Sequence, residues 1–192
     1  MDLQQFFTRE VFSIYDVYGD LKAEESIHLT RQGISNNEFA HTHKFKALLI
    51  PETVISEGDK IVSPNNEEYL IMSMRKIQFM NTNQATAWLC DNTCSIYRLE
   101  NKYINGKKAG KTLNPIIENT PCVQKDTNGK LNYYDAGLLE TTVKVVYLQK
   151  TADIHLLDRL VINNERYKID SIGNTIKDIL TLQLSPDKQE IE

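Results

Sequence analysis

The clearest chemical pattern in the chain is the segment from Gly106 to Thr112, which reads Gly-Lys-Lys-Ala-Gly-Lys-Thr. It approaches a phosphate-binding loop, in which successive backbone N–H groups wrap the phosphates and a helix follows. The two glycines are one residue too close for that pattern, and Pro115 stands where the helix would run. The sequence therefore favours a lysine-rich hairpin tip over a nucleotide site, and no cofactor is predicted.

The same segment concentrates positive charge. Its lysines, with one neighbour, are Lys102, Lys107, Lys108 and Lys111. On a chain of net charge −4, such a cluster favours contact with an acidic partner surface or with passing DNA. A solvated loop is the alternative. No groove-reading helix accompanies the lysines, so they are predicted to face a partner or DNA without reading base sequence.

Three cysteines and a histidine pair provide soft metal ligands: Cys90, Cys94, Cys122, His41 and His43. Structural zinc sites usually take their ligands from two closely spaced pairs. The second cysteine pair is missing here, so buried thiols and surface imidazoles are favoured, with zinc as the alternative and no metal site predicted. Three cysteines also cannot build a disulfide framework, which indicates folding in a reducing compartment.

Residues for covalent or acid–base catalysis do not form a recognisable set. The chain has no Gly-x-Ser-x-Gly elbow, and its four histidines follow no signature that links them to a nucleophile. The carboxylate pairs Glu24-Glu25 and Glu67-Glu68 are adjacent, so their side chains diverge. We therefore predict no catalytic residues and a protein that is not an enzyme.

Composition limits the remaining classes. The 192 residues carry 22 basic and 26 acidic side chains, and 41% are hydrophobic. These values are typical of a folded protein and argue against one that coats nucleic acid. The longest apolar runs fall far below the ~18 residues of a membrane span. A soluble protein that folds in the cytoplasm, with no membrane partner, is expected.

The elements that must position any site are strands. Short segments rich in Val, Ile, Leu and Tyr alternate with Asn, Asp, Gly and Pro clusters, as at 44–50, 60–62, 69–72, 141–148, 159–162 and 167–172. The pairs Asn105-Gly106 and Asn128-Gly129 predict two tight hairpins, because both residue types accept positive φ. The fold class is therefore all-β.

An internal repeat divides the chain. Residues 58–71 read GDKIVSPNNEEYLI, and residues 157–169 read LDRLVINNERYKI. Each copy has Asp, a basic residue, two aliphatics, an Asn-rich turn, Glu and Tyr, and an apolar strand precedes each at the same distance. Chance similarity between hairpins is the alternative. Duplication predicts two small β-barrel or sandwich modules.

The repeat resembles the small β-barrels of tailed-bacteriophage head–tail connector (stopper) and tail-joining proteins. The resemblance lies in Ile-Ser-Glu-Gly-Asp-Lys-Ile (55–61), the turn, and Glu-Tyr-Leu-Ile (68–71); the second copy has Leu157 where the family prefers Gly. The predicted organisation is an N-terminal segment (1–43), a first barrel module (44–98), a hairpin arm with inserted loops (99–140) and a second barrel module (141–192).

The resemblance implies a structural virion protein that forms a homo-oligomeric ring of six or twelve copies around the DNA channel. Such a ring joins the capsid portal or adaptor to the tail, so the expected location is the virion. The hairpin arm would then dock on neighbours, with its lysines toward DNA or an acidic ring. The alternative is a ligand- or carbohydrate-binding β module of a tail or baseplate assembly, for which Tyr97, Tyr103, Tyr133 and Tyr134 are available aromatics.

Overall fold

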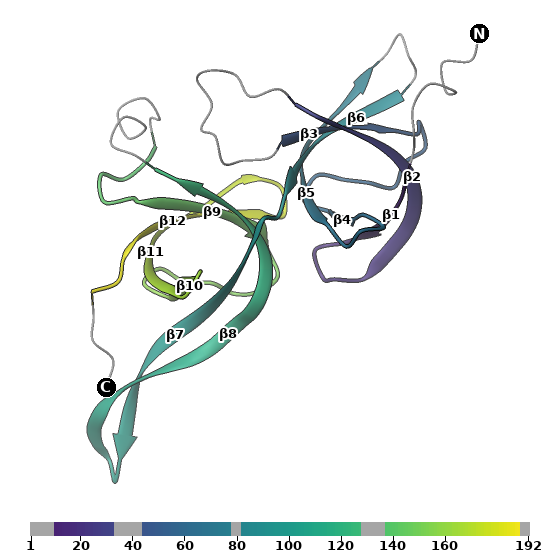
Figure 1. Cartoon of the computed structure of the whole chain (residues 1–192). Coiled ribbons are helices and arrows are strands. Elements are labelled where there is room, and N and C mark those ends of the chain that lie inside the picture. Colours follow the sequence, from purple (N-terminus) through teal and green to yellow (C-terminus); the bar gives the residue numbers. More distant parts are fainter. Residues whose placement is uncertain (1–9, 33–43, 78–81, 128–136, 189–192) are drawn as a thin grey trace, which may run out of the picture. The chain divides into compact units, whose positions relative to one another are not determined.

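In the computed structural model the described residues are 10–32, 44–77, 82–127 and 137–188, and every regular element in them is a strand. The first six strands are β1 (Glu10–Tyr15), β2 (Leu21–Arg31), β3 (Lys44–Leu49), β4 (Lys60–Val62), β5 (Glu68–Ile77) and β6 (Thr82–Leu89). The next six are β7 (Asn92–Ile104), β8 (Lys107–Asp126), β9 (Lys144–Gln149), β10 (Arg159–Ile162), β11 (Glu165–Ile176) and β12 (Ile179–Pro186). Each set closes into a barrel (Figure 1), which confirms the all-β fold with two barrel modules.

The two barrels have the same topology. Around the first, the strand order is β1-β2-β3-β6-β5-β4, and around the second it is β7-β8-β9-β12-β11-β10, each closing on itself. The duplication therefore covers a complete six-strand barrel and not only the hairpin found in the sequence. The barrels accordingly begin earlier than the predicted modules of 44–98 and 141–192, because β1, β2, β7 and β8 are barrel strands.

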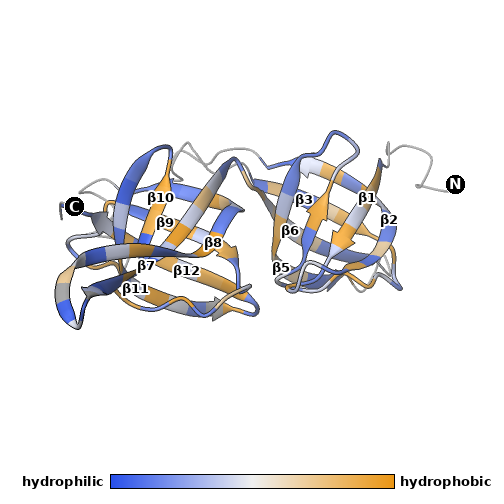
Figure 2. Ribbon diagram, turned by 90° about the horizontal axis from the view of Figure 1, so that it is seen from below, coloured by the Kyte–Doolittle hydropathy of each residue, from blue (hydrophilic) through white to orange (hydrophobic). Residues whose placement is uncertain are grey.

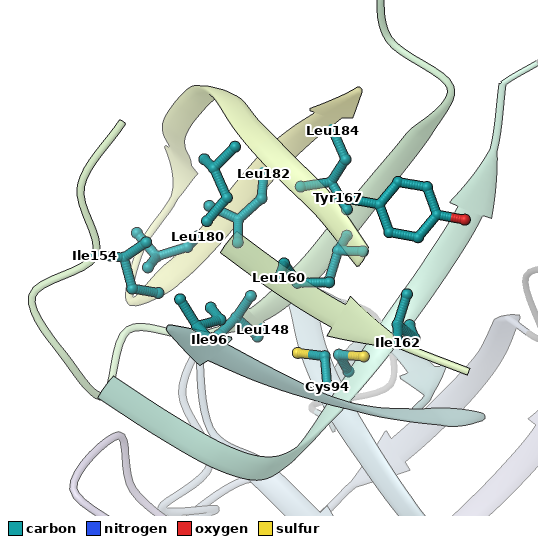
Figure 3. Packing of buried hydrophobic residues seen from close by; sticks show 13 residues of the cluster. Cys94, Ile96, Leu148, Ile154, Leu160, Ile162, Tyr167, Leu180, Leu182 and Leu184 are labelled. Carbon is teal, nitrogen blue, oxygen red and sulfur yellow. The ribbon is translucent and has the colours of Figure 1, made fainter. Parts of the chain in front are cut away.

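Alternation of apolar and polar side chains fills each barrel from within. Figure 2 shows the alternation as bands of hydrophobic and hydrophilic residues along the strands. In β1, Phe12 and Ile14 are buried, whereas Val11, next to Phe12 in the chain, is 53% exposed. Figure 3 shows the equivalent interior of the second barrel, where Ile96, Leu148, Leu160 and Leu182 pack together. Each barrel thus has its own hydrophobic core.

Barrel closure uses equivalent residues in the two copies. Ile14 of β1 pairs with Ile61 of β4, and Ile96 of β7 pairs with Leu160 of β10. Ile14 and Ile96 each lie in a Ser-Ile-Tyr tripeptide, at 13–15 and 95–97. The repeat therefore extends to the first strand of each barrel, beyond the region where the sequence alone made it visible.

A buried aspartate organises the turn before the closing hairpin in each barrel. Asp59 Oδ2 accepts hydrogen bonds from the Ser56 amide (2.8 Å) and from Lys22 Nζ (2.7 Å). Asp158 accepts from the His155 amide (2.8 Å) and from Arg98 Nε and Nη2 (3.1 and 3.0 Å). The repeated Asp of the sequence thus fixes a tight turn and neutralises its charge against a basic side chain from another strand.

Removing either aspartate should destabilise its own barrel. Asp158 is 3% exposed, and Asp158→Ala removes the carboxylate that both the Arg98 guanidinium and the His155 amide bind, at a cost of about 1.5–3 kcal/mol. Asp59→Ala should do the same in the first barrel. Urea unfolding measures both, with Asp153→Ala as control because that side chain is 84% exposed. An Asp158→Ala midpoint equal to that of Asp153→Ala would contradict the assignment.

The residue before each aspartate adopts a left-handed conformation. Gly58 has φ of 90°, and Leu157 at the equivalent place has φ of 69°. A leucine in this region is strained by about 1–2 kcal/mol, because its Cβ crowds the following carbonyl. The departure from Gly that the sequence revealed is therefore accommodated with strain, and the fold of the turn is unchanged.

Replacing Leu157 by glycine should relieve this strain. The side chain is 61% exposed, so little buried contact is lost. We expect Leu157→Gly to raise the free energy of unfolding by about 1 kcal/mol, measured by thermal and urea unfolding. The neighbouring Leu156→Gly is the matched control: its φ is not positive, and it should lower stability by ~0.5–1 kcal/mol. Equal effects of the two substitutions would exclude backbone strain at Leu157.

Candidate functional site

The β7–β8 hairpin is the feature that most distinguishes the second barrel from the first. β7 and β8 have 13 and 20 residues, against 6 and 11 in β1 and β2. β7 pairs with β10 only through Cys94–Tyr97, and β8 pairs with β9 only through Val123–Asp126. Residues 98–114, here called the arm, therefore form a two-stranded ribbon that runs out from its barrel (Figure 1).

The arm is shorter than the predicted insertion of 99–140. After Asn114, β8 returns to the barrel, where Ile117 pairs with Ile96 and packs against the core. The second predicted hairpin, at Asn128-Gly129, lies outside the described residues. The first is confirmed: Asn105 and Gly106 have φ of 54° and 74°, as the turn type requires. The segment that approaches a phosphate-binding loop, Gly106–Thr112, is thus the second half of a hairpin turn followed by the start of β8.

Hydrogen bonds anchor the base of the arm to the barrel. The Arg98 guanidinium binds Asp158 and also donates from Nη2 to the Asp153 carbonyl (2.8 Å). The hydrogen bond to Asp158 raises the pKa of Arg98 further above its usual value, although desolvation opposes it. On the other strand, the Asn119 amide donates to Ser95 Oγ (3.0 Å). The ribbon therefore leaves the barrel in a fixed direction.

The predicted lysines whose side chains the structure describes lie on both faces of the arm. Lys102 pairs with Gly110 and Ile104 pairs with Lys107, so Lys102 and Lys107 belong to one face. Asn101 pairs with Lys111, which places Lys111 on the other face, and Lys108 pairs with Tyr103 in the backbone ladder. Lys102, Lys107 and Lys111 are thus brought together near the end of the arm without forming a single-sided patch.

The lysine side chains that the structure describes in the arm have no acidic side chain paired with them. Lys102, Lys107 and Lys111 are exposed, and within the described residues none of their ammonium groups forms an ion pair. The arm's acidic side chain, Glu100, instead accepts a hydrogen bond from Asn114 Nδ2 (2.6 Å) across the ribbon. The tip is therefore positively charged on both faces, in a position to meet an anionic surface from either side.

The cysteines are placed separately by the fold. Cys94 and Cys122 are buried in the second barrel's core, and Cys90 follows β6 of the first. The described residues contain no group of three or more His, Cys, Asp and Glu side chains arranged to hold a metal ion; His41 and His43 lie outside them. Within the same ranges no helix has the length and apolar character of a membrane span.

The sequence did not predict the ion pair that fixes the base of the arm, between Arg98 and Asp158. Asp158 was visible as part of the repeat, but its partner lies on β7, distant in sequence. The corresponding partner of Asp59 is Lys22 on β2, so the basic residue does not come from the equivalent strand in the two copies. Only the barrel closure brings Arg98 and Asp158 together.

Comparisons of the chain with protein-family models, curated proteins and solved structures give no match.

The thiols should be inert in the folded protein. Burial raises the pKa of the Cys90 thiol well above its usual value, and the nearby Glu68 carboxylate adds to the shift, so the reactive thiolate is scarce. We expect all three cysteines to react with an aromatic disulfide reagent on the order of 100-fold more slowly than a free thiol at pH 8, and rapidly in denaturant. A fast phase that disappears in Cys90→Ser would contradict this.

Proposed function

We propose that this chain is a structural protein of a tailed-bacteriophage virion that forms a homo-oligomeric ring at the head–tail connector or neck. Its partners are further copies of itself, in a ring of six or twelve, and the portal, adaptor and tail proteins next to it. The observation that supports the proposal best is the arm. It is a two-stranded ribbon that is hydrogen-bonded to a closed barrel at its base and carries a positively charged tip.

The arm is suited to strand pairing between copies. Each barrel is closed, so its strands have all their ladder partners, whereas beyond Tyr97 the outer edge of β7 pairs with no strand in the described residues. A two-stranded ribbon alone is marginally stable in water, and exposed strand edges add readily to another sheet. Pairing of the arm with a neighbouring copy would satisfy these backbone groups and link the copies in a ring.

The charge of the tip supports a position beside the DNA channel or an acidic partner ring. Lys102, Lys107 and Lys111 would contact phosphates or carboxylates without base specificity. The alternative, a carbohydrate-binding module, needs exposed aromatic side chains on one face. Tyr103 is 62% exposed but Tyr97 is only partly so, and Tyr133 and Tyr134 lie outside the described residues. We therefore propose ring formation in preference to carbohydrate binding.

Shortening the arm tests the ring. Replacing residues 100–112 with Asn-Gly keeps the Leu99–Leu113 pair and the closure of the barrel while removing the tip. We expect light scattering and native mass spectrometry to find a multi-copy ring for the intact chain and mainly single copies for the shortened one. An intact chain that stays monomeric at its highest soluble concentration would contradict assembly by this chain alone.

A matched control separates strand pairing from charge. The triple substitution Lys102→Gln, Lys107→Gln and Lys111→Gln keeps the ribbon and removes its charge. This variant should still assemble and should lose salt-sensitive binding to DNA. Circular dichroism checks that each variant retains its strand content. A glycan that bound the intact and shortened chains equally, with no assembly of either, would favour the carbohydrate-binding alternative.

A further inference from the structure

The outer face of the first barrel carries a polar pocket that the proposed ring does not explain. Its volume is about 220 Å³, and it is lined by Gln32, Lys46, Ser73, Arg75, Gln84 and Thr86. Every lining side chain is a hydrogen-bonding group, two are cations and none is a carboxylate. A hollow with this composition is suited to an anion.

Strand register explains why these residues meet. Lys46 of β3 pairs with Thr86 of β6, which pairs in turn with Ser73 of β5, so the three lie in one row across the sheet. Arg75 and Gln84 form the adjacent row. The register of β5 against β6 shifts between Ile71 and Ser73, and this irregularity places Ser73 and Arg75 on the outer face.

A buried amide orients the arginine. Gln84 is 5% exposed, and its Oε1 accepts a hydrogen bond from Arg75 Nε at 2.6 Å. The bond holds the guanidinium plane and leaves its two terminal nitrogens available. In the described parts of the chain neither Arg75 nor Lys46 forms an ion pair with a carboxylate. The pocket therefore presents two uncompensated cations flanking two hydroxyls.

The equivalent face of the second barrel is satisfied by its own chain. Gln183, which corresponds to Thr86, accepts hydrogen bonds from the Leu139 amide (2.9 Å) and Thr142 Oγ1 (3.0 Å) and donates to the Gly137 carbonyl (2.8 Å). Asp170 on β11 is paired with Lys168 (2.9 Å). The positive pocket thus belongs to one copy of the duplicated barrel and does not follow from the fold itself.

We propose that this pocket binds a phosphate group. A tetrahedral phosphate offers oxygens in several directions, which matches a guanidinium edge, an ammonium and two hydroxyls converging from three strands. The group can come from a free phosphate-bearing small molecule or from a nucleic-acid backbone, and the two sources are distinguished by the test. The proposal does not depend on ring formation.

The test measures binding of inorganic phosphate, glycerol phosphate and a short oligothymidine by calorimetry and by amide NMR shifts, in a buffer without phosphate. Arg75→Gln and Lys46→Gln should each weaken binding on the order of tenfold, and Arg75→Lys should weaken it because the planar fork is lost. Lys76→Gln is the matched control, since Lys76 is the next residue of β5 and does not line the pocket. Thermal unfolding verifies that each variant is folded.

The outcomes separate the sources. Phosphate or glycerol phosphate that shifts the amides of Ser73 and Thr86 and loses affinity in Arg75→Gln identifies a small-molecule site. Binding of oligothymidine alone, with the same sensitivity to Arg75→Gln and not to Lys76→Gln, identifies a backbone phosphate. The proposal would be overturned if the intact chain, Arg75→Gln and Lys46→Gln bound all three probes with equal affinity, or if none of the probes bound.

Discussion

Closure of each barrel between its first and fourth strands is the constraint on which the rest of this structure depends. The closing ladders are short: Ser13–Tyr15 pairs with Lys60–Val62, and Cys94–Tyr97 pairs with Arg159–Ile162. Each closing strand begins immediately after the turn held by Asp59 or Asp158. The buried carboxylate thus sets where the strand starts, and with it the register that directs apolar side chains into the core.

Closure also decides where strand edges can exist. A closed barrel pairs every strand on both sides, so it presents no edge to other chains. In the second barrel, β7 and β8 continue past the last residue that closure requires, and the surplus becomes the arm. The Arg98–Asp158 ion pair links the two features, because the aspartate that fixes the turn also fixes the base of the arm.

The sequence predicted well what local pattern determines. The apolar segments 44–50 and 159–162 contain the strands β3 and β10, Asn105-Gly106 is the turn of a hairpin, and the repeated Asp and Tyr occupy equivalent places. In both copies the Tyr hydroxyl donates to the Glu two residues before it, as in Tyr69 to Glu67. These features depend on residues that are close together in the chain, so they can be predicted from one sequence.

What depends on pairing between distant strands was not visible. β8 contains Pro115 and Pro121, residues that usually interrupt strands, and its composition indicated loops. Prolines are tolerated where a strand lacks a partner on one side, and within the described residues β8 pairs with β9 only from Val123 onward. The pocket was hidden for a similar reason, since Lys46 and Arg75 become neighbours only through the register of three strands.

Duplication followed by divergence explains how one fold carries two different surfaces. Cys90 after β6 and Asp187 after β12 occupy equivalent places. The Cys90 amide donates to the Glu68 carbonyl, and the Asp187 amide donates to the Arg166 carbonyl. Around the thiol, Lys60 pairs with Glu68, whereas Arg159 pairs with Asp187 itself. The backbone hydrogen bond is therefore the same in both copies, whereas the ion pairs between the side chains differ. Because the barrel tolerates such exchange outside its core, the first copy could acquire a cationic pocket and the second an arm without loss of closure in either.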